Sequence, residues 1–292
     1  MKYSILHCEG GIGKNILATA VVSSLKSSDP ERKIIVVCAW PQVWFNNPDV
    51  YQIYPFGQVA NFYKNYIYKQ DVKIYRHEPY HSEDYILNKK HLIQVWCDLI
   101  GIKWNGNGPK LYFSPLEIEY LKLKMLQNVS KPIFILHTNG GGGNARPYSW
   151  YRDLPFQNSK DVVDYFKNDY HIYQLGYEGQ DLIEGCHRLT LDTREVLGSV
   201  MISQKRLLID SFSQHASVAL GVKSVVCWIG NKPDVLGYDT NINIKPNVEP
   251  VYDTLHSSYI EDFDIGGNPV QFPYDRLKIF DSSEIIQNLL SL

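Results

Sequence analysis

The chain has 292 residues, which is long for one domain and comfortable for two; 44% of them are hydrophobic and 21% are charged. These fractions are typical of a soluble globular protein with substantial cores. The formal net charge of −2 excludes a bulk electrostatic attraction to nucleic acid or to anionic lipid, although a local basic patch stays open.

The cysteines are odd in number and far apart in the sequence, with no C-x-x-C pair; they are Cys8, Cys38, Cys97, Cys186 and Cys227. Several lie within apolar runs such as "IIVVCAW". We therefore expect buried, reduced thiols in a cytoplasmic protein, and no zinc site. The residues before the first glycine turn are too few for a charged-then-apolar leader, and we expect no transmembrane segment because no apolar run is long enough.

The first predicted elements are a strand, a glycine turn, a helix and a second strand. "KYSILHC" is a short apolar run, "NILATAVVSSLKSS" has apolar residues at helical spacing, and "RKIIVVCAW" predicts a buried strand. Such a unit starts a parallel sheet. A glycine turn before a helix exposes backbone N–H groups, which favour an anion.

The glycine turn, Gly10 to Lys14, is close to a phosphate-binding loop but departs from it at two positions. The full pattern G-x-x-x-x-G-K-[ST] would put its first glycine at Cys8 and its magnesium-binding hydroxyl at Asn15. The variant K-G-G-x-G-K-[ST] fits better, yet it has a lysine where Glu9 stands and again a hydroxyl at Asn15. A P-loop-like ATPase that uses Gly10–Lys14 is therefore the alternative and not the leading prediction.

The remainder of the first half is predicted to contain a strand at 50–54, a second strand followed by a polar loop, and an amphipathic helix in "KKHLIQVWCDLIGIKW" that ends at Gly101. Titratable residues cluster on the loop; they are His77, Glu78, His81, Glu83 and Asp84. The loop is either a solvated surface segment or an acid/base or acceptor-binding loop that faces a cleft.

The stretch from 106 to 132 marks a boundary, because Gly and Pro punctuate it before a helix with strong start signals. Ser114 is the expected cap, Pro115 lies in the first turn, and Glu117 follows three residues after the cap. We therefore expect one domain over 1–128 and a second over 129–292.

After the boundary, strands and helices alternate again. "PIFILH", "YHIYQL", "RLLID" and "KSVVCWIG" predict strands, whereas "SKDVVDYFKN" and "REVLGSVMISQ" predict helices. A last helix, "DSSEIIQNLLSL", has Asp281 as its cap, and we expect it to pack back on the first domain. The pattern predicts two α/β domains with parallel sheets, and ligands in the cleft between them at the carboxyl ends of the strands.

The second half resembles glycosyltransferase family 9, the heptosyltransferase-like sugar transferases of the GT-B fold. "ILHTNGGGGNARPYSW" is similar to the family's strand, loop and Arg-x-x-x-Trp stretch, and "YQLGYEGQD" to its strand with a Gly-x-x-x-Glu-like ending. "LIDSFSQHASVALGVKSVVCWIGNKPD" is similar to D-S-G-x-x-H-x-A-x-A-L-G followed by a strand and Gly-x-x-x-Pro. The matching residues of this last stretch are Asp210, Ser211, His215, Ala219, Leu220, Gly221, Gly230 and Pro233. The first half fits the family layout more weakly, and no motif matches between about 51 and 127.

The resemblance implies two Rossmann-like, doubly wound parallel-sheet domains that face a cleft. It implies a metal-independent, inverting glycosyltransferase that moves a sugar from a nucleotide-diphosphate donor, ADP-linked by the resemblance, to an acceptor hydroxyl, with no tightly bound cofactor. The acceptor would be a glycan or a lipopolysaccharide core sugar; a modified nucleic-acid base stays open, so nucleic acid enters only as an acceptor. A catalytically inactive nucleotide-sugar-binding relative is a further alternative.

The donor is expected on the second half, where "DSFSQHAS" puts a helix amino terminus after a strand and so offers N–H groups and a positive dipole to a diphosphate. Arg146 would pair with phosphate, and Glu178 would accept from ribose hydroxyls. The expected donor-binding residues are His137, Asn139, Gly140, Arg146, Gly176, Glu178, Asp210, Ser211, Ser213, Gln214 and His215.

Two positions depart from the family pattern. An aspartate commonly follows the glycine turn and is taken as the general base, but this position is Lys14, which would instead stabilise the leaving diphosphate or hold an anionic acceptor. The candidates for the base are then Glu9, His81 and Glu83. Phe212 stands where the pattern has glycine and leaves less room for a phosphate.

Overall fold

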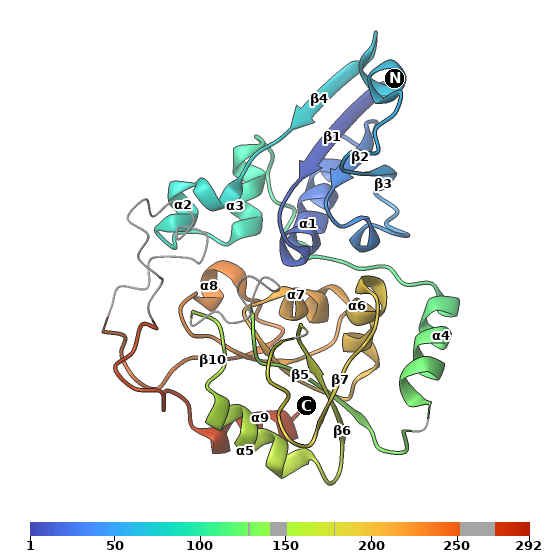
Figure 1. Cartoon of the computed structure of the whole chain (residues 1–292). Helices are drawn as coiled ribbons and strands as arrows, with labels where there is room; N and C mark the ends of the chain where they lie inside the picture. Colours follow the sequence, from blue (N-terminus) through green and yellow to red (C-terminus); the bar gives the residue numbers. More distant parts are fainter. Residues whose placement is uncertain (128, 141–150, 178, 252–271) are drawn as a thin grey trace.

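The computed structural model describes residues 1–127, 129–140, 151–177, 179–251 and 272–292. Within these ranges the chain forms two β-sheets, one from each half of the sequence, with helices packed on them (Figure 1). Every strand pairing in both sheets is parallel. The expected class, two α/β units with parallel sheets, is confirmed.

The first sheet has four strands in the order β3-β2-β1-β4. They are β1 (Lys2–Cys8), β2 (Lys33–Cys38), β3 (Val50–Pro55) and β4 (Asp71–Tyr75). Helix α1 (Ile12–Ser28) connects β1 to β2 and is buried along most of its length. It lies between this sheet and helices on its other side, which explains why its apolar residues are spread around it and do not form one narrow stripe.

Short helices complete the first half: η1 (Pro41–Val43), η2 (Tyr63–Ile67), η3 (Pro79–His81), α2 (Glu83–Ile86) and α3 (Leu92–Leu99). The helix expected to end at Gly101 is shorter than its apolar pattern. It begins after His91, whose ring Nδ1 accepts the N–H of Ile93 at 3.2 Å and caps the helix. It ends before Gly101, which takes a φ of +73° that a helix cannot contain.

The second sheet has six strands in the order β10-β9-β8-β5-β6-β7. They are β5 (Ile133–His137), β6 (His171–Leu175), β7 (Cys186–Arg188), β8 (Lys205–Ile209), β9 (Val225–Cys227) and β10 (Ile242–Ile244). Its helices are α5 (Phe156–Phe166), α6 (Thr193–Ile202), α7 (Phe212–Ala219), α8 (Pro233–Leu236) and α9 (Ser282–Leu290). This strand order is that of a dinucleotide-binding fold. The sequence did not predict β7 and β10, because each has three residues and neither lies in a longer apolar run, as the equally short β9 does.

Helix α4 (Pro115–Leu126) follows the first half and begins as expected. The Ser114 hydroxyl accepts the N–H of Glu117, and the Glu117 carboxylate accepts the N–H of Ser114. The helix packs on α6, where a Cβ at Gly198 would collide with the Leu121 side chain. The connecting segment thus lies on a helix of the second half, and a domain border at 128 stays a prediction.

Arg194 in α6 joins the two halves. Its Nη1 donates to the Gln42 carbonyl at 2.9 Å, its Nη2 donates to the Tyr112 carbonyl, and its Nε donates to the Glu117 carboxylate at 2.9 Å. The guanidinium also lies 3.7 Å from the centre of the Phe113 ring. The side chain is therefore anchored by charge-assisted hydrogen bonds and by an aromatic face at once.

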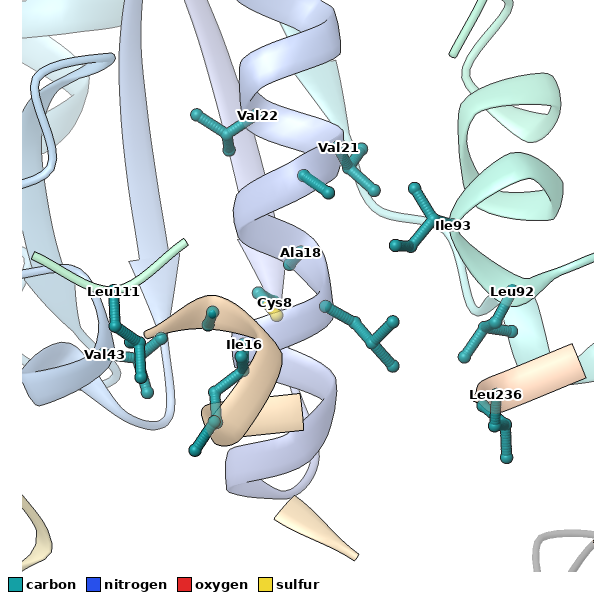
Figure 2. Close-up of a cluster of buried hydrophobic side chains, with 14 of the residues drawn as sticks. Cys8, Ile16, Ala18, Val21, Val22, Val43, Leu92, Ile93, Leu111 and Leu236 are labelled. Atoms are coloured by element: carbon teal, nitrogen blue, oxygen red, sulfur yellow. The ribbon is translucent and has the colours of Figure 1, made fainter. Parts of the chain in front are cut away.

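One apolar core runs through both halves. Figure 2 shows side chains of α1 beside Leu92 and Ile93 of α3 and Leu236 of α8. Val43 and Leu111 lie on the other side of α1 in the same cluster. Since Leu236 belongs to the second half and Leu92 to the first, the halves are joined by buried apolar surface as well as by Arg194.

The last helix, α9, does not pack back on the first half as expected. It contacts α5, β8 and β9 of the second half, where Ile285 and Leu289 are fully buried (Figure 1). Asp281 caps it as predicted, accepting the Ser283 N–H at 2.9 Å. Its apolar residues therefore complete the core on the far face of the second sheet.

All five cysteines are free and buried. Burial raises the pKa of Cys97 to about 11 and the pKa of Cys38 and of Cys186 to about 12. We predict that a thiol reagent such as DTNB labels the folded protein slowly at pH 8, because the reactive thiolate is scarce and inaccessible. All five thiols should react rapidly in denaturant, and fast labelling of any one of them in the folded protein would contradict the prediction.

The Glu117 carboxylate accepts hydrogen bonds from the Arg194 guanidinium and from the Ser114 N–H. Burial disfavours its charge, but the hydrogen bonds from Arg194 and Ser114 outweigh this and lower the pKa of Glu117 to about 2 from its usual 4.5. A pKa that is lower in the folded state stabilises the protein above about pH 4.5, and this stabilisation is lost as the pH falls towards 2. The Tm of Glu117→Gln should therefore lie below that of the parent protein at pH 7, with a difference that narrows as the solution is acidified. The exposed neighbour variant Glu119→Gln is the control, and a pH-independent difference would count against the ion pair.

Candidate functional site

The candidate site lies where the strand order of each sheet reverses. In the second sheet the chain moves from β5 outward to β6 and β7, and then returns to β8 on the other side of β5. The first sheet does the same between β1 and β4. In open parallel sheets, ligands bind outside the carboxyl ends of the strands at such a switch point. The residues that follow β1, β4, β5 and β8 therefore form the candidate site.

Helices α1 and α7 begin at these two switch points and pack on each other at their first turns (Figure 1). A Cβ on Gly13 would lie 3.2 Å from His215 Cδ2 and 3.4 Å from the Cα of Phe212. Glycine at this position therefore allows the backbones of the two helices to approach closely. Gly13 serves helix packing, a role that the P-loop-like spacing did not indicate.

His137, the last residue of β5, contacts Ser213 in the first turn of α7, the helix that follows β8. The His137 Nδ1 lies 2.7 Å from the Ser213 hydroxyl, and both residues are buried. Burial is the main reason that the pKa of His137 falls to about 4. His137 is thus neutral at pH 7, and the pair fixes the first turn of α7 to the end of β5.

Asp210 follows β8 and is 5% exposed. Its carboxylate accepts a hydrogen bond from the Asn231 amide. Burial raises the pKa of Asp210, whereas the nearby Arg152 guanidinium and the Asn231 hydrogen bond oppose this effect. Asp210 also contributes to raising the pKa of Tyr80, for which burial is the largest cause. Asp210 of the second half therefore acts electrostatically on Tyr80, which follows β4 in the first half.

The amino terminus of α7 begins at Ser211, whose side chain makes no capping hydrogen bond to the helix. Gln214 and His215 of the first two turns are buried; the Gln214 amide donates to the Leu236 carbonyl at 2.9 Å, and the His215 Nδ1 lies 2.9 Å from the Tyr238 hydroxyl. Burial lowers the pKa of His215 to about 3. These two expected donor-binding side chains therefore bond to the segment that contains α8 and Tyr238.

Asn139 and Gly140 turn the chain after β5. The Gly140 N–H donates to the Asp153 carboxylate at 2.7 Å, and the Asn139 amide donates to the same carboxylate at 3.3 Å. A Cβ on Gly140 would lie 3.3 Å from the Arg152 Cβ, so glycine makes room for this arginine. Of the other expected donor residues, Gly176 is in close contact with the Gln180 side chain, and Arg146 and Glu178 lie outside the described residues.

Lys14 is the buried cation of the first switch point. Its side chain turns back over Gly10, which has a φ of +86° and where a Cβ would lie 3.1 Å from Lys14 Cδ. The Nζ forms an ion pair with the Glu78 carboxylate and lies 5.7 and 5.5 Å from the centres of the Tyr80 and Trp96 rings. Lys14 therefore binds a carboxylate of its own chain within an aromatic enclosure.

The three candidates for the general base lie in different surroundings. Glu9, directly after β1, accepts a hydrogen bond from Arg76 at 2.8 Å across the first switch point. Glu83 pairs with Lys89 at 2.7 Å, and its side chain is 76% exposed. His81 is also exposed, at the end of η3. The structure brings Glu9 to the switch point, whereas Glu83 lies on the surface of α2.

A cavity of about 1010 Å³ adjoins the carboxyl ends of β5 and β6, between the amino-terminal turns of α5 and α9. Thr138, Asn139 and Gln174 form the edge of this cavity next to the sheet. Its charged lining residues are Asp153, Asp161, Asp181, Lys278 and Asp281. The acidic lining disfavours a phosphate inside the cavity and suits groups that donate hydrogen bonds.

Four residues of this region were not among the predicted site residues: Glu78, Tyr80, Arg152 and Asn231. Glu78 and Tyr80 lie in the titratable and aromatic loop that the sequence singled out, but nothing in that loop indicated which member would meet Lys14. Arg152 lies six residues after the predicted Arg146, and Asn231 lies between the matched residues Gly230 and Pro233. Motif matching finds these segments but cannot rank the side chains within them.

In the ranges that the structure describes, no three His, Cys, Asp or Glu side chains are grouped so as to hold a metal ion. Nor does any helix there have the length and apolar character to span a membrane.

Comparison with known proteins gives structural matches only. No protein-family profile and no curated protein matches the sequence. The glycosyl transferase family 9 structure from Veillonella parvula has a TM-score of 0.69 at 13% identity and covers 99% of this chain and 97% of its own. E. coli ADP-heptose lps heptosyltransferase II has a TM-score of 0.68 at 12% identity, covering 99% of this chain and 98% of its own. E. coli heptosyltransferase WaaC with ADP has a TM-score of 0.60 at 10% identity, covering 100% and 99%.

At these identities the likeness establishes the fold. Nearly the whole length of each chain is aligned, so both sheets and the connection between them are shared. The expected resemblance is confirmed at this level: the chain has the two-domain GT-B fold of the family 9 glycosyltransferases.

Proposed function

We propose that the protein is a glycosyltransferase that moves a sugar from a nucleotide-diphosphate donor to an acceptor hydroxyl. The observation that carries this proposal is the meeting of the two switch points: the start of α7, directly after the Asp210 turn, lies against the first turn of α1, directly after β1. In a GT-B fold one ligand would bind to each half, and this arrangement would bring their reacting ends together.

The donor diphosphate is assigned to the second half. The first turn of α7 offers backbone N–H groups and the positive end of a helix dipole. Arg152 supports this assignment, because its charge acts on Asp210, His137 and Tyr80 and so lies among the groups of the junction. An arginine in this position would stabilise the charge that develops on the leaving diphosphate without a metal ion.

The nucleoside end of the donor is assigned to the acidic cavity beside β5 and β6. The cavity adjoins Asn139, which is also part of the loop next to Arg152, so a ligand that extends from the junction would reach it. Its carboxylates would accept hydrogen bonds from ribose hydroxyls and from a base. ADP is the favoured nucleotide, because the similar E. coli WaaC and TibC structures hold ADP or ADP-linked heptose.

The reaction would proceed by attack of the acceptor oxygen on the anomeric carbon. The bond from that carbon to the diphosphate breaks, the nucleoside diphosphate leaves, and the hydroxyl proton passes to a base. Attack from the face opposite the diphosphate would invert the anomeric configuration. A glycan or lipopolysaccharide core sugar is the proposed acceptor, a cytoplasmic location is the expected one, and metal independence predicts full activity in EDTA.

The P-loop-like alternative is less well supported. In that mechanism the lysine of the glycine turn binds nucleotide phosphates. Here the Lys14 ammonium is buried and paired with Glu78, and Gly13 packs on α7 and does not border open space. A phosphate at Lys14 would have to displace a carboxylate of the same charge sign.

The proposal predicts selective stabilisation by a nucleotide sugar. Thermal unfolding would be followed with ADP, ADP-heptose, and UDP-, GDP- and CDP-linked sugars, each with and without Mg²⁺. A ligand that binds only the folded chain adds about 2.7 kcal/mol at roughly 100 times its Kd. A shift with one of these ligands in EDTA is the expected result, and no shift with any of them would contradict the proposal.

Variants locate the ligand. Arg152→Met should weaken binding of the selected nucleotide, because a lost charge-assisted hydrogen bond costs about 1.5–3 kcal/mol, or roughly 10- to 150-fold in Kd. The exposed Arg276, which pairs with Asp275, provides the matched control Arg276→Met. Loss of nucleotide binding in Lys14→Met, with Arg152→Met unaffected, would favour the ATPase alternative.

A further inference from the structure

Glu78 is the carboxylate that the first switch point presents to the junction of the two halves. It follows β4, on the opposite side of the switch point from Lys14, which begins its helix after β1. The Lys14 side chain is 4% exposed and the Glu78 side chain is 24% exposed. The carboxylate is thus the member of the pair that solvent or a ligand can reach, while the cation lies behind it.

The surroundings of Lys14 require a partner of negative charge. Its ammonium lies between the Tyr80 and Trp96 rings, and burying it without a counter-ion would be costly. The pair therefore fixes one of the two Glu78 carboxylate oxygens. The other oxygen accepts the Tyr80 N–H at 3.4 Å, which orients the carboxylate further.

Other carboxylates of the region are engaged differently. Asp210 is almost fully buried and bonded to Asn231, Glu9 is bonded to the exposed Arg76, and Glu83 lies at the surface of α2 with Lys89. Gly13, the residue before Lys14, packs on Phe212 and His215 of α7, so the Lys14–Glu78 pair lies at the end of the first half that meets the start of α7.

We propose that Glu78 is the general base that takes the proton of the acceptor hydroxyl, with Lys14 as its positioning residue. This inference rests on the proposed function. It replaces Glu9, His81 and Glu83 as the candidates for this role, and it gives Lys14 a task other than phosphate binding. The hydroxyl proton moves to Glu78 as the acceptor oxygen bonds to the anomeric carbon and the nucleoside diphosphate leaves.

The test measures nucleotide-sugar cleavage with water as the acceptor, using ADP-heptose or whichever nucleotide sugar stabilises the protein, and follows nucleotide release. Glu78→Gln should lower kcat by about 10²- to 10⁴-fold, as loss of a general base does, with the affinity for ADP unchanged. Glu78→Asp, which keeps the charge but shortens the side chain, should retain part of the activity. Glu31→Gln, which removes a carboxylate from the exposed pair with Lys2, is the matched control.

The double variant Lys14→Met/Glu78→Gln separates catalysis from folding. Glu78→Gln alone leaves a buried lysine without its counter-ion and should lower Tm, whereas the double variant removes both charges and should recover stability. If Glu78 is the base, the double variant regains Tm but not kcat. If the pair is only structural, activity returns together with Tm, and the inference is overturned.

Failure of the wild-type protein to bind any nucleotide would refute the proposed function itself, not only the role of Glu78.

Discussion

The arrangement of the site depends on the close packing of α1 on α7. The first turns of α1 and α7 can approach this closely because one of them lacks a side chain at the contact, and Gly13 is that position. Because each helix starts at the switch point of its own sheet, this contact brings the carboxyl ends of the two sheets together. A larger residue at 13 would push the first turns of α1 and α7 apart and so separate the carboxyl ends of the two sheets.

The polar groups at this junction are buried and held in place before any ligand arrives. His137 is bonded to Ser213, Asp210 to Asn231 and Lys14 to Glu78. Fixed polar groups cost little further ordering when a ligand binds, and they act strongly in a region that excludes water. The same burial that makes these groups effective makes them sensitive to loss of a partner.

The sequence was a good guide to the sheets and a partial guide to the site. Apolar runs and helix caps predicted most strands and the start of α4, since these depend on neighbouring residues; the capping box of Ser114 and Glu117 is the clearest case. The strands β7 and β10 are short and lie outside the longer apolar runs, so they leave no pattern. The Lys14–Glu78 pair joins residues 64 positions apart, and Gly13 packs on a helix some 200 residues away, so neither contact leaves a local signal. The family motifs indicated the Asp210 turn. At position 14 they indicated only that lysine stands where the family commonly has aspartate.

The apolar core that runs from α3 through α1 to α8 limits how far the two halves can move relative to each other. Halves joined by a thin polar interface can swing apart about a hinge, whereas halves that share a buried apolar core cannot do so without exposing it to water. Leu92 and Leu236 belong to one such core. Arg194 also joins the two halves, through its hydrogen bond to the Gln42 carbonyl. We therefore expect the two sheets to move as a single rigid frame.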